Sequence, residues 1–170
     1  MSGQLPVQID PIRLADEGAR LGGTLPGGEF ARLRGLVLPD SRPEPVAVDL
    51  KFERTGQGVR RLHGTIRTRV EMACKRCLQP LQIEIVAQPQ ILLLEPNEAE
   101  SDDGETLVVG APLSLAELVE DELLLAMPMS PGHGEGECAV AFPVTAGKAP
   151  AGEKIVNPFA ELRGFKGKNQ

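Results

Sequence analysis

The sequence predicts an α+β fold: a single domain in which an antiparallel β meander packs with a few helices, followed by a flexible C-terminal tail. Hydrophobic and polar residues alternate over several segments within residues 46–94, which is the pattern of strands with one buried face. A helical hydrophobic pattern over residues 114–127 supplies an element that can cover such a sheet. The length of 170 residues suits one domain with tails. We therefore assign residues 1–129 to the domain and the Gly-, Pro- and Ala-rich residues 130–170 to the tail.

The N-terminal region is predicted to contain a short edge strand and two helices. After the strand at residues 5–9, Asp10 is an N-cap residue and Pro11 occupies the first helical position. This helix is expected to end near Arg20, before a pair of glycines. A second short helix is expected over residues 29–37, and a proline-rich connection then leads to the sheet.

Three alternating segments form the predicted meander. Residues 46–53 and 59–72 read as the two strands of a hairpin, and residues 81–86 form the next strand. Pro89 should bend or interrupt the sheet, because proline cannot donate a ladder hydrogen bond. The helix that follows begins with a capping box at Ser114 and ends before a proline.

Charge is distributed unevenly along the chain. The net charge is −6, yet residues 51–76 carry eight Lys or Arg against two Glu, and residues 95–122 carry ten Asp or Glu with no cation. The sequence therefore predicts one basic and one acidic region. Five Phe and no Trp or Tyr disfavour an RNA reader that stacks bases on aromatic rings. No apolar run approaches the length of a membrane span, the N-terminal residues lack the charged-then-apolar pattern of a signal peptide, and an odd number of cysteines leads us to expect the reducing cytoplasm.

The three cysteines and one histidine form a candidate metal site. Cys74 and Cys77 are two residues apart at a turn between strands, and His133 precedes Cys138 by five positions. Together they make a Cys3His set, the ligand type and number of a closed tetrahedral zinc site. Unmetallated thiols remain an alternative, because so long a spacing fixes no geometry. A redox dithiol is disfavoured, since a strand and not a helix follows the pair.

One face of the predicted strand at residues 59–72 is basic. Arg61, His63, Arg67 and Arg69 share that face, and Arg76 follows at the turn. Such a patch can bind the phosphates of RNA or an acidic partner. The alternative is an ordinary solvated strand face, which often carries arginine and threonine.

The predicted helix at residues 114–127 carries Glu117, Glu120 and Asp121 on its outer face. These residues are a candidate surface for a basic partner, and a solvated helix face is the alternative. No nucleophile elbow, phosphate loop, dinucleotide fingerprint or zinc-protease motif is present. We therefore expect neither an enzyme nor a small-molecule substrate.

Several of these segments together resemble the bacterial YceD family, the large ribosomal RNA subunit accumulation proteins. The resemblance rests on Cys74–Pro80, on Leu118–Pro128, on the His133 and Cys138 pair and on Asn157–Ala160. It implies a small cytoplasmic protein needed for normal processing or accumulation of large-subunit ribosomal RNA, with no established catalytic activity. It also strengthens the expectation that the cysteine and histidine set has a metal or another shared role.

Two hypotheses about function follow. The first is a non-enzymatic ribosome-biogenesis factor that contacts large-subunit precursor RNA, or a protein handling it, through the basic strand. The alternative is an adaptor whose acidic helix binds a basic partner, such as a ribosomal protein, without touching RNA. In both, the Asn157-Pro158-Phe159 motif is a candidate docking element for the domain itself or for a partner.

Overall fold

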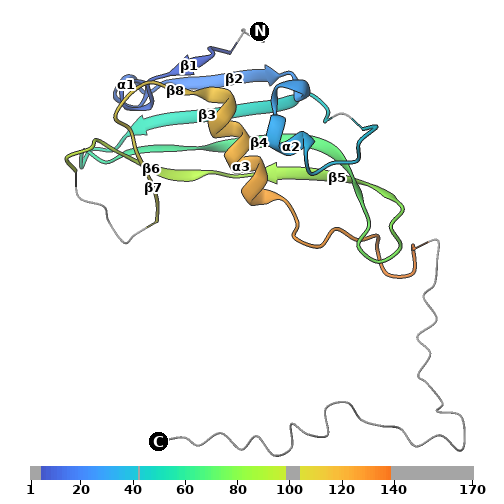
Figure 1. Ribbon diagram of the computed structural model, residues 1–170. Coiled ribbons are helices and arrows are strands. Elements are labelled where there is room, and N and C mark those ends of the chain that lie inside the picture. Colours follow the sequence, from blue (N-terminus) through green and yellow to red (C-terminus); the bar gives the residue numbers. More distant parts are fainter. Residues whose placement is uncertain (1–4, 42, 99–103, 139–170) are drawn as a thin grey trace, which may run out of the picture. The chain divides into compact units, whose positions relative to one another are not determined.

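The computed structural model describes residues 5–41, 43–98 and 104–138, which form a mixed β-sheet with helices packed on one face (Figure 1). The α+β class predicted from the sequence is confirmed. The predicted docking motif at residues 157–159 lies outside the described residues. The elements are β1 (Gln8–Ile9), α1 (Pro11–Glu17), β2 (Arg20–Leu25), the 3₁₀ helix η1 (Gly27–Glu29), α2 (Ala31–Arg34), β3 (Val46–Arg54), β4 (Arg60–Ala73), β5 (Pro80–Ala87), β6 (Gln90–Leu94), β7 (Glu105–Val108), β8 (Leu113–Ser114) and α3 (Leu115–Ala126).

The first helix is shorter than the sequence pattern indicated. Asp10 is its N-cap, as predicted, and accepts a hydrogen bond of 3.1 Å from the backbone N–H of Arg13. The helix ends at Glu17 because Gly18 takes the left-handed conformation, with φ of 65°. Arg20, which was expected to end the helix, instead begins β2, and this strand pairs antiparallel with β3. The predicted helical boundary was therefore wrong.

The sheet contains the predicted meander and extends it. Its strand order is β2-β3-β4-β6-β7, with β5 also paired to β4. The long strand β4 pairs with β3 on one side, while on its other side residues 60–63 pair with β6 and residues 66–73 pair with β5. The chain leaves the sheet between β5 and β6, at the position of Pro89, where an interruption was predicted. The parallel pairing of β6 with β7 was not predicted.

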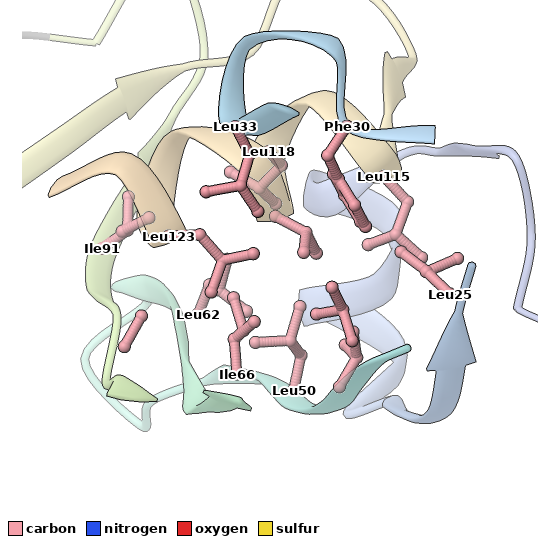
Figure 2. Close-up of a cluster of buried hydrophobic side chains, with 14 of the residues drawn as sticks. Leu25, Phe30, Leu33, Leu50, Leu62, Ile66, Ile91, Leu115, Leu118 and Leu123 are labelled. Carbon is pink, nitrogen blue, oxygen red and sulfur yellow. The ribbon is translucent and has the colours of Figure 1, made fainter. Parts of the chain in front are cut away.

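The hydrophobic core lies between the sheet and helix α3 (Figure 2). Leu50, Leu62 and Ile66 project from β3 and β4 toward the helix, and Leu115 and Leu123 project from α3 toward the sheet. All five side chains are fully buried. Burial of each stabilises the fold by about 1.5–3 kcal/mol relative to exposure. This apolar layer fixes which face of the sheet is covered and leaves the other face open.

The acidic helix does not present all of its predicted surface residues to solvent. Helix α3 begins at the predicted capping box, where Ser114 Oγ accepts a hydrogen bond from the N–H of Glu117. Glu120, however, is only 6% exposed. Its carboxylate accepts hydrogen bonds from the backbone N–H groups of Arg32 (2.7 Å) and Leu33 (3.0 Å) and from the Arg32 guanidinium (2.9 Å). Glu120 therefore provides hydrogen-bond acceptors for N–H groups at the start of α2. This helix has four residues and is shorter than the helix predicted over residues 29–37.

These contacts make Glu120 a pH-dependent contributor to stability. Burial alone would raise the pKa of Glu120, but the hydrogen bonds from Leu33 and Arg32 outweigh it and the pKa is lowered. The contribution is present above the ordinary carboxylate pKa of 4.5 and is lost as the pH falls through the lowered value. Glu120→Ala should lower the free energy of unfolding at pH 7 by about 2–4 kcal/mol, because two N–H groups of α2 lose their partner.

Urea denaturation of Glu120→Ala and of the exposed control Glu117→Ala would check this. The control should change stability by no more than about 0.5 kcal/mol. The loss of unfolding free energy caused by Glu120→Ala should shrink progressively as the pH falls below 4.5. A deficit that stays constant down to the acid transition would contradict the assigned role.

Candidate metal centre and basic sheet face

Cys74 and Cys77 lie on a tight turn that connects β4 to β5. The turn is closed by backbone hydrogen bonds from Cys74 N–H to Gln79 O and from Leu78 N–H to Cys74 O, each 2.9 Å long. Within it, the N–H of Arg76 points at Cys74 Sγ at 3.4 Å. Both cysteines are buried, and neither is in a disulfide. The turn therefore holds two sulfur atoms in one shielded place.

The chain after α3 returns to this turn and brings the other two candidate ligands. Lys75 N–H donates to Pro131 O at 2.8 Å, which ties the returning segment to the turn. The guanidinium of Arg76 donates to the carbonyl oxygens of His133 and Gly134. Arg76 was predicted to join the basic strand, but the turn directs it to the cluster instead. Its position there comes from tertiary contacts that sequence spacing does not reveal.

The four ligand atoms of the Cys3His set all lie within 4.8 Å of one another. Cys74 Sγ is 3.9 Å from Cys138 Sγ, and Cys77 Sγ is 3.4 Å from His133 Nδ1. The other ring nitrogen, His133 Nε2, lies 3.2 Å from Pro80 O and donates to it. Because Nε2 carries the proton, the lone pair of Nδ1 is directed at the sulfurs. Metal-bound histidines are oriented in the same way, by a hydrogen bond from the ring nitrogen that does not bind the metal. The group can therefore hold a metal ion.

The surroundings favour the thiolate at one of these sulfurs. The pKa of Cys74 is lowered to about 5, chiefly by the backbone N–H of Cys77 and also by hydrogen bonds from His133 and Arg76. Burial raises the pKa of Cys138, and the neighbouring Cys77 adds to that effect. Thiolate is the form of cysteine that binds metals. The lowered pKa of Cys74 therefore favours the metal-binding form of this ligand.

A second candidate site is the basic sheet face, which we define as Arg61, His63, Arg67 and Arg69 on β4. The three arginines are exposed and His63 is half-buried. They lie on the side of the sheet opposite α3, because the alternate residues of β4 point into the core. The structure thus brings Arg61, His63, Arg67 and Arg69 to one face of β4, and Arg76 lies away from that face.

Nearby acidic residues neutralise part of this face. Glu53 on β3 makes ion pairs with Lys51 (2.7 Å), Arg61 (3.3 Å) and, when protonated, His63 (3.8 Å). Arg67 lies opposite Val86 and Arg69 opposite Glu84 in the β4–β5 ladder. Among the described residues, neither Arg67 nor Arg69 is in an ion pair within 4 Å. These two arginines are the available cations of the face.

The basic stretch of sequence is also divided between the two sides of the sheet. Arg54 and Arg60 pair with Asp16 of α1, at 3.3 Å and 2.8 Å. Arg60 additionally approaches Glu95 and Glu98 on the loop after β6. The expectation of a single basic region was therefore too simple.

The predicted acidic partner surface is smaller than the sequence suggested. Glu117 and Asp121 are exposed, but Asp121 pairs with Arg32 at 2.6 Å and Glu120 is buried. The helical pattern could not indicate the contacts of Glu120 and Asp121 with Arg32, because Arg32 lies nearly ninety positions away in the chain.

The comparisons with known proteins identify the relatives of the chain. The model of the family described as "Large ribosomal RNA subunit accumulation protein YceD" matches residues 62–166. This chain belongs to the YceD family. The Large ribosomal RNA subunit accumulation protein YceD of Haemophilus influenzae is 28% identical over 189 aligned positions, which cover 97% of this chain and 98% of that protein. No solved structure matches the chain significantly.

The region matched by the YceD family includes every candidate metal ligand and most of the basic sheet face. It begins at Leu62, inside β4, and extends past Cys138. Arg61 lies just before it. No helix in the described parts of this YceD-family chain is long and apolar enough to cross a membrane.

One residue of the cysteine turn has a strained backbone. Leu78 has φ of 60° although it is not glycine, and its side chain is 73% exposed. Leu78→Gly should raise the free energy of unfolding by up to about 1 kcal/mol, because glycine adopts this conformation without strain and the mostly exposed leucine side chain contributes little packing. Leu78→Val should destabilise instead, since a β-branched residue fits φ > 0 poorly. Thermal unfolding of both variants tests this, and equal melting temperatures would contradict it.

Proposed function

We propose that this protein is a non-enzymatic cytoplasmic factor in ribosome biogenesis that supports the accumulation of large-subunit ribosomal RNA. The observation that carries the proposal is the near full-length match to a protein named for that role, in H. influenzae, together with the family match. The absence of recognisable catalytic motifs in the sequence is consistent with a binding role.

The basic sheet face is the proposed contact with large-subunit precursor RNA. Arg67 and Arg69 extend from alternate positions of one strand, so their guanidinium groups lie on the same side. Guanidinium groups bind phosphate oxygens through paired, charge-assisted hydrogen bonds. The chain has few aromatic residues for base stacking. We therefore infer that it binds the RNA backbone, with little direct reading of base sequence.

The Cys3His set is proposed to hold a structural zinc ion. With Zn–S bonds of about 2.3 Å and Zn–N bonds of about 2.0 Å, a tetrahedral site has S···S edges of about 3.8 Å and S···N edges of about 3.5 Å. The separations of 3.9 Å between Cys74 and Cys138 and of 3.4 Å between Cys77 and His133 are close to these edges. Four protein ligands leave no open position for a reacting water, so the ion would fasten residues 131–138 to the β4–β5 turn.

The alternative, an adaptor whose acidic helix binds a basic partner without RNA contact, has less support. Of the three residues predicted to form this surface, Glu120 is buried and Asp121 is paired with Arg32. Glu117 is left as the one exposed carboxylate of the three that makes no ion pair with a described residue. Surface carboxylates of this kind contribute little to affinity on their own.

The zinc proposal predicts close to one equivalent of zinc in protein purified under reducing conditions. Cys77→Ser should lose the metal and unfold at a lower temperature, because structural zinc adds its binding energy to folding. A chelator should lower the melting temperature of the unaltered protein and leave that of Cys77→Ser unchanged. Lys75→Ala, in the same turn, should retain zinc. Metal well below one equivalent with three freely titrating thiols would disprove the site.

The RNA proposal predicts that large-subunit precursor RNA crosslinks to the protein in ultraviolet-irradiated cells. Arg67→Ala combined with Arg69→Ala should reduce the crosslinked RNA roughly tenfold and make binding less salt-dependent, since two phosphate contacts are removed. Arg13→Ala combined with Arg34→Ala removes the same charge from α1 and α2 and should preserve crosslinking. Equal loss in both double variants would indicate a net-charge effect and contradict a specific face.

A further inference from the structure

A groove runs between strand β7 and helix α3, on the side of the sheet away from the basic sheet face. It has a volume of about 430 Å³. The apolar part of its lining includes Ile91 and Leu107 from the sheet and Leu118 and Leu125 from the helix. Leu125 is 72% exposed, so this apolar surface faces solvent at one rim. The apolar surface of the groove can therefore be reached from solvent.

An unpaired carboxylate lies within this groove. Glu122 lines it and is only 7% exposed, yet it makes no hydrogen bond or ion pair with any residue that the structure describes. Glu120, two residues earlier and equally buried, accepts three hydrogen bonds. Every fully buried side-chain nitrogen or oxygen among the described residues has a hydrogen-bond partner, so the Glu122 oxygens stay in contact with solvent although most of the side chain is covered. Glu122 therefore differs from Glu120 in having no structural partner.

Neighbouring carboxylates increase the attraction of the groove for a cation. Burial raises the pKa of Glu122, and the charges of Glu105 and Asp121, which line the same groove, raise it further. Asp121 already pairs with Arg32. Glu105 and Glu122 are left without a cation from the described residues. A positive side chain entering between them would relieve this repulsion and find apolar contacts beside it.

Strand β7 also offers backbone pairing. Within the described residues it is the last strand of the sheet and pairs only with β6. The N–H and C=O groups on its other edge are available for an added strand. Glu105 and Leu107 lie opposite Ile91 and Leu93 in the ladder, so they face the groove side. A strand added here would place alternate side chains under α3, one near a carboxylate and the next near a leucine.

We propose that the groove between β7 and α3 binds an extended basic peptide segment of a partner protein, which pairs with β7 and places an Arg or Lys side chain between Glu105 and Glu122. This goes beyond the proposed RNA contact, because it lies on the other side of the sheet and takes a ligand of opposite charge. The same carboxylates repel nucleic acid, which favours a peptide as the occupant.

The test uses the full chain and a fluorescent ten-residue peptide in which one strand face carries arginine and valine and the other carries threonine. Anisotropy should show saturable binding, and amide signals of β7 should shift in nuclear magnetic resonance spectra. A second peptide with glutamate in place of arginine should not bind. Glu122→Gln keeps the shape of the side chain and should weaken binding at least fivefold. Glu117→Gln removes the same charge from outside the groove and should bind normally.

Two further measurements show that a loss of peptide binding does not come from misfolding or from the RNA-binding face. Glu122→Gln should be as stable as the unaltered protein or more so, since it removes a carboxylate whose ionisation burial disfavours. Arg67→Ala combined with Arg69→Ala should bind the peptide normally even where RNA crosslinking is lost. The proposal is overturned if the peptide does not bind, or if Glu122→Gln and Glu117→Gln bind it equally. It is also overturned if a second copy fills the groove, seen as a dimer that Glu122→Gln dissociates.

Discussion

The alternation of side chains along β4 is the constraint on which both faces of the molecule depend. Leu62, Ile66 and Val70 point into the core beneath α3, and the intervening arginines point away from it. A slip of one residue in the pairing with β3 would exchange the two sets and bury the cations. The same alternation continues to Cys74, which follows the strand on its buried side. The register that forms the core therefore also positions the first candidate metal ligand and the basic sheet face.

Helix α3 shows how two nearby carboxylates acquire different roles from their surroundings. Glu120 faces the beginning of α2, where backbone N–H groups compensate for its loss of water. Glu122 lines the groove beside β7, where the charges of Glu105 and Asp121 act on it. The pKa of Glu120 is lowered and that of Glu122 is raised, although both side chains are buried. Burial alone thus does not decide the role of an acidic residue. The groups that face it do.

The sequence predicted what depends on local pattern and missed what depends on distant partners. Strict alternation located β3 and β4, and the capping box located the start of α3. Residue type alone selected the four candidate ligands, but their approach depends on the contact between Lys75 and Pro131, which no spacing encodes. The left-handed Gly18 ended α1 early in a segment that reads as helical. The burial of Glu120 depends on Arg32, 88 positions away, and the parallel pairing of β7 with β6 joins residues 14 positions apart, with no local pattern that specifies it.

The two proposed binding surfaces are compatible because the sheet separates them. The basic sheet face and the acidic groove lie on opposite sides of the sheet, and at physiological salt exposed charges are screened beyond about 8 Å. RNA bound on one side would therefore not compete directly with a basic peptide at the edge of the other. Basic segments bind nucleic acid non-specifically through its phosphates. A domain that binds such a segment in an acidic groove while holding RNA on its opposite face would keep the segment close to the RNA. The groove would at the same time reduce the non-specific contacts between the segment and the RNA.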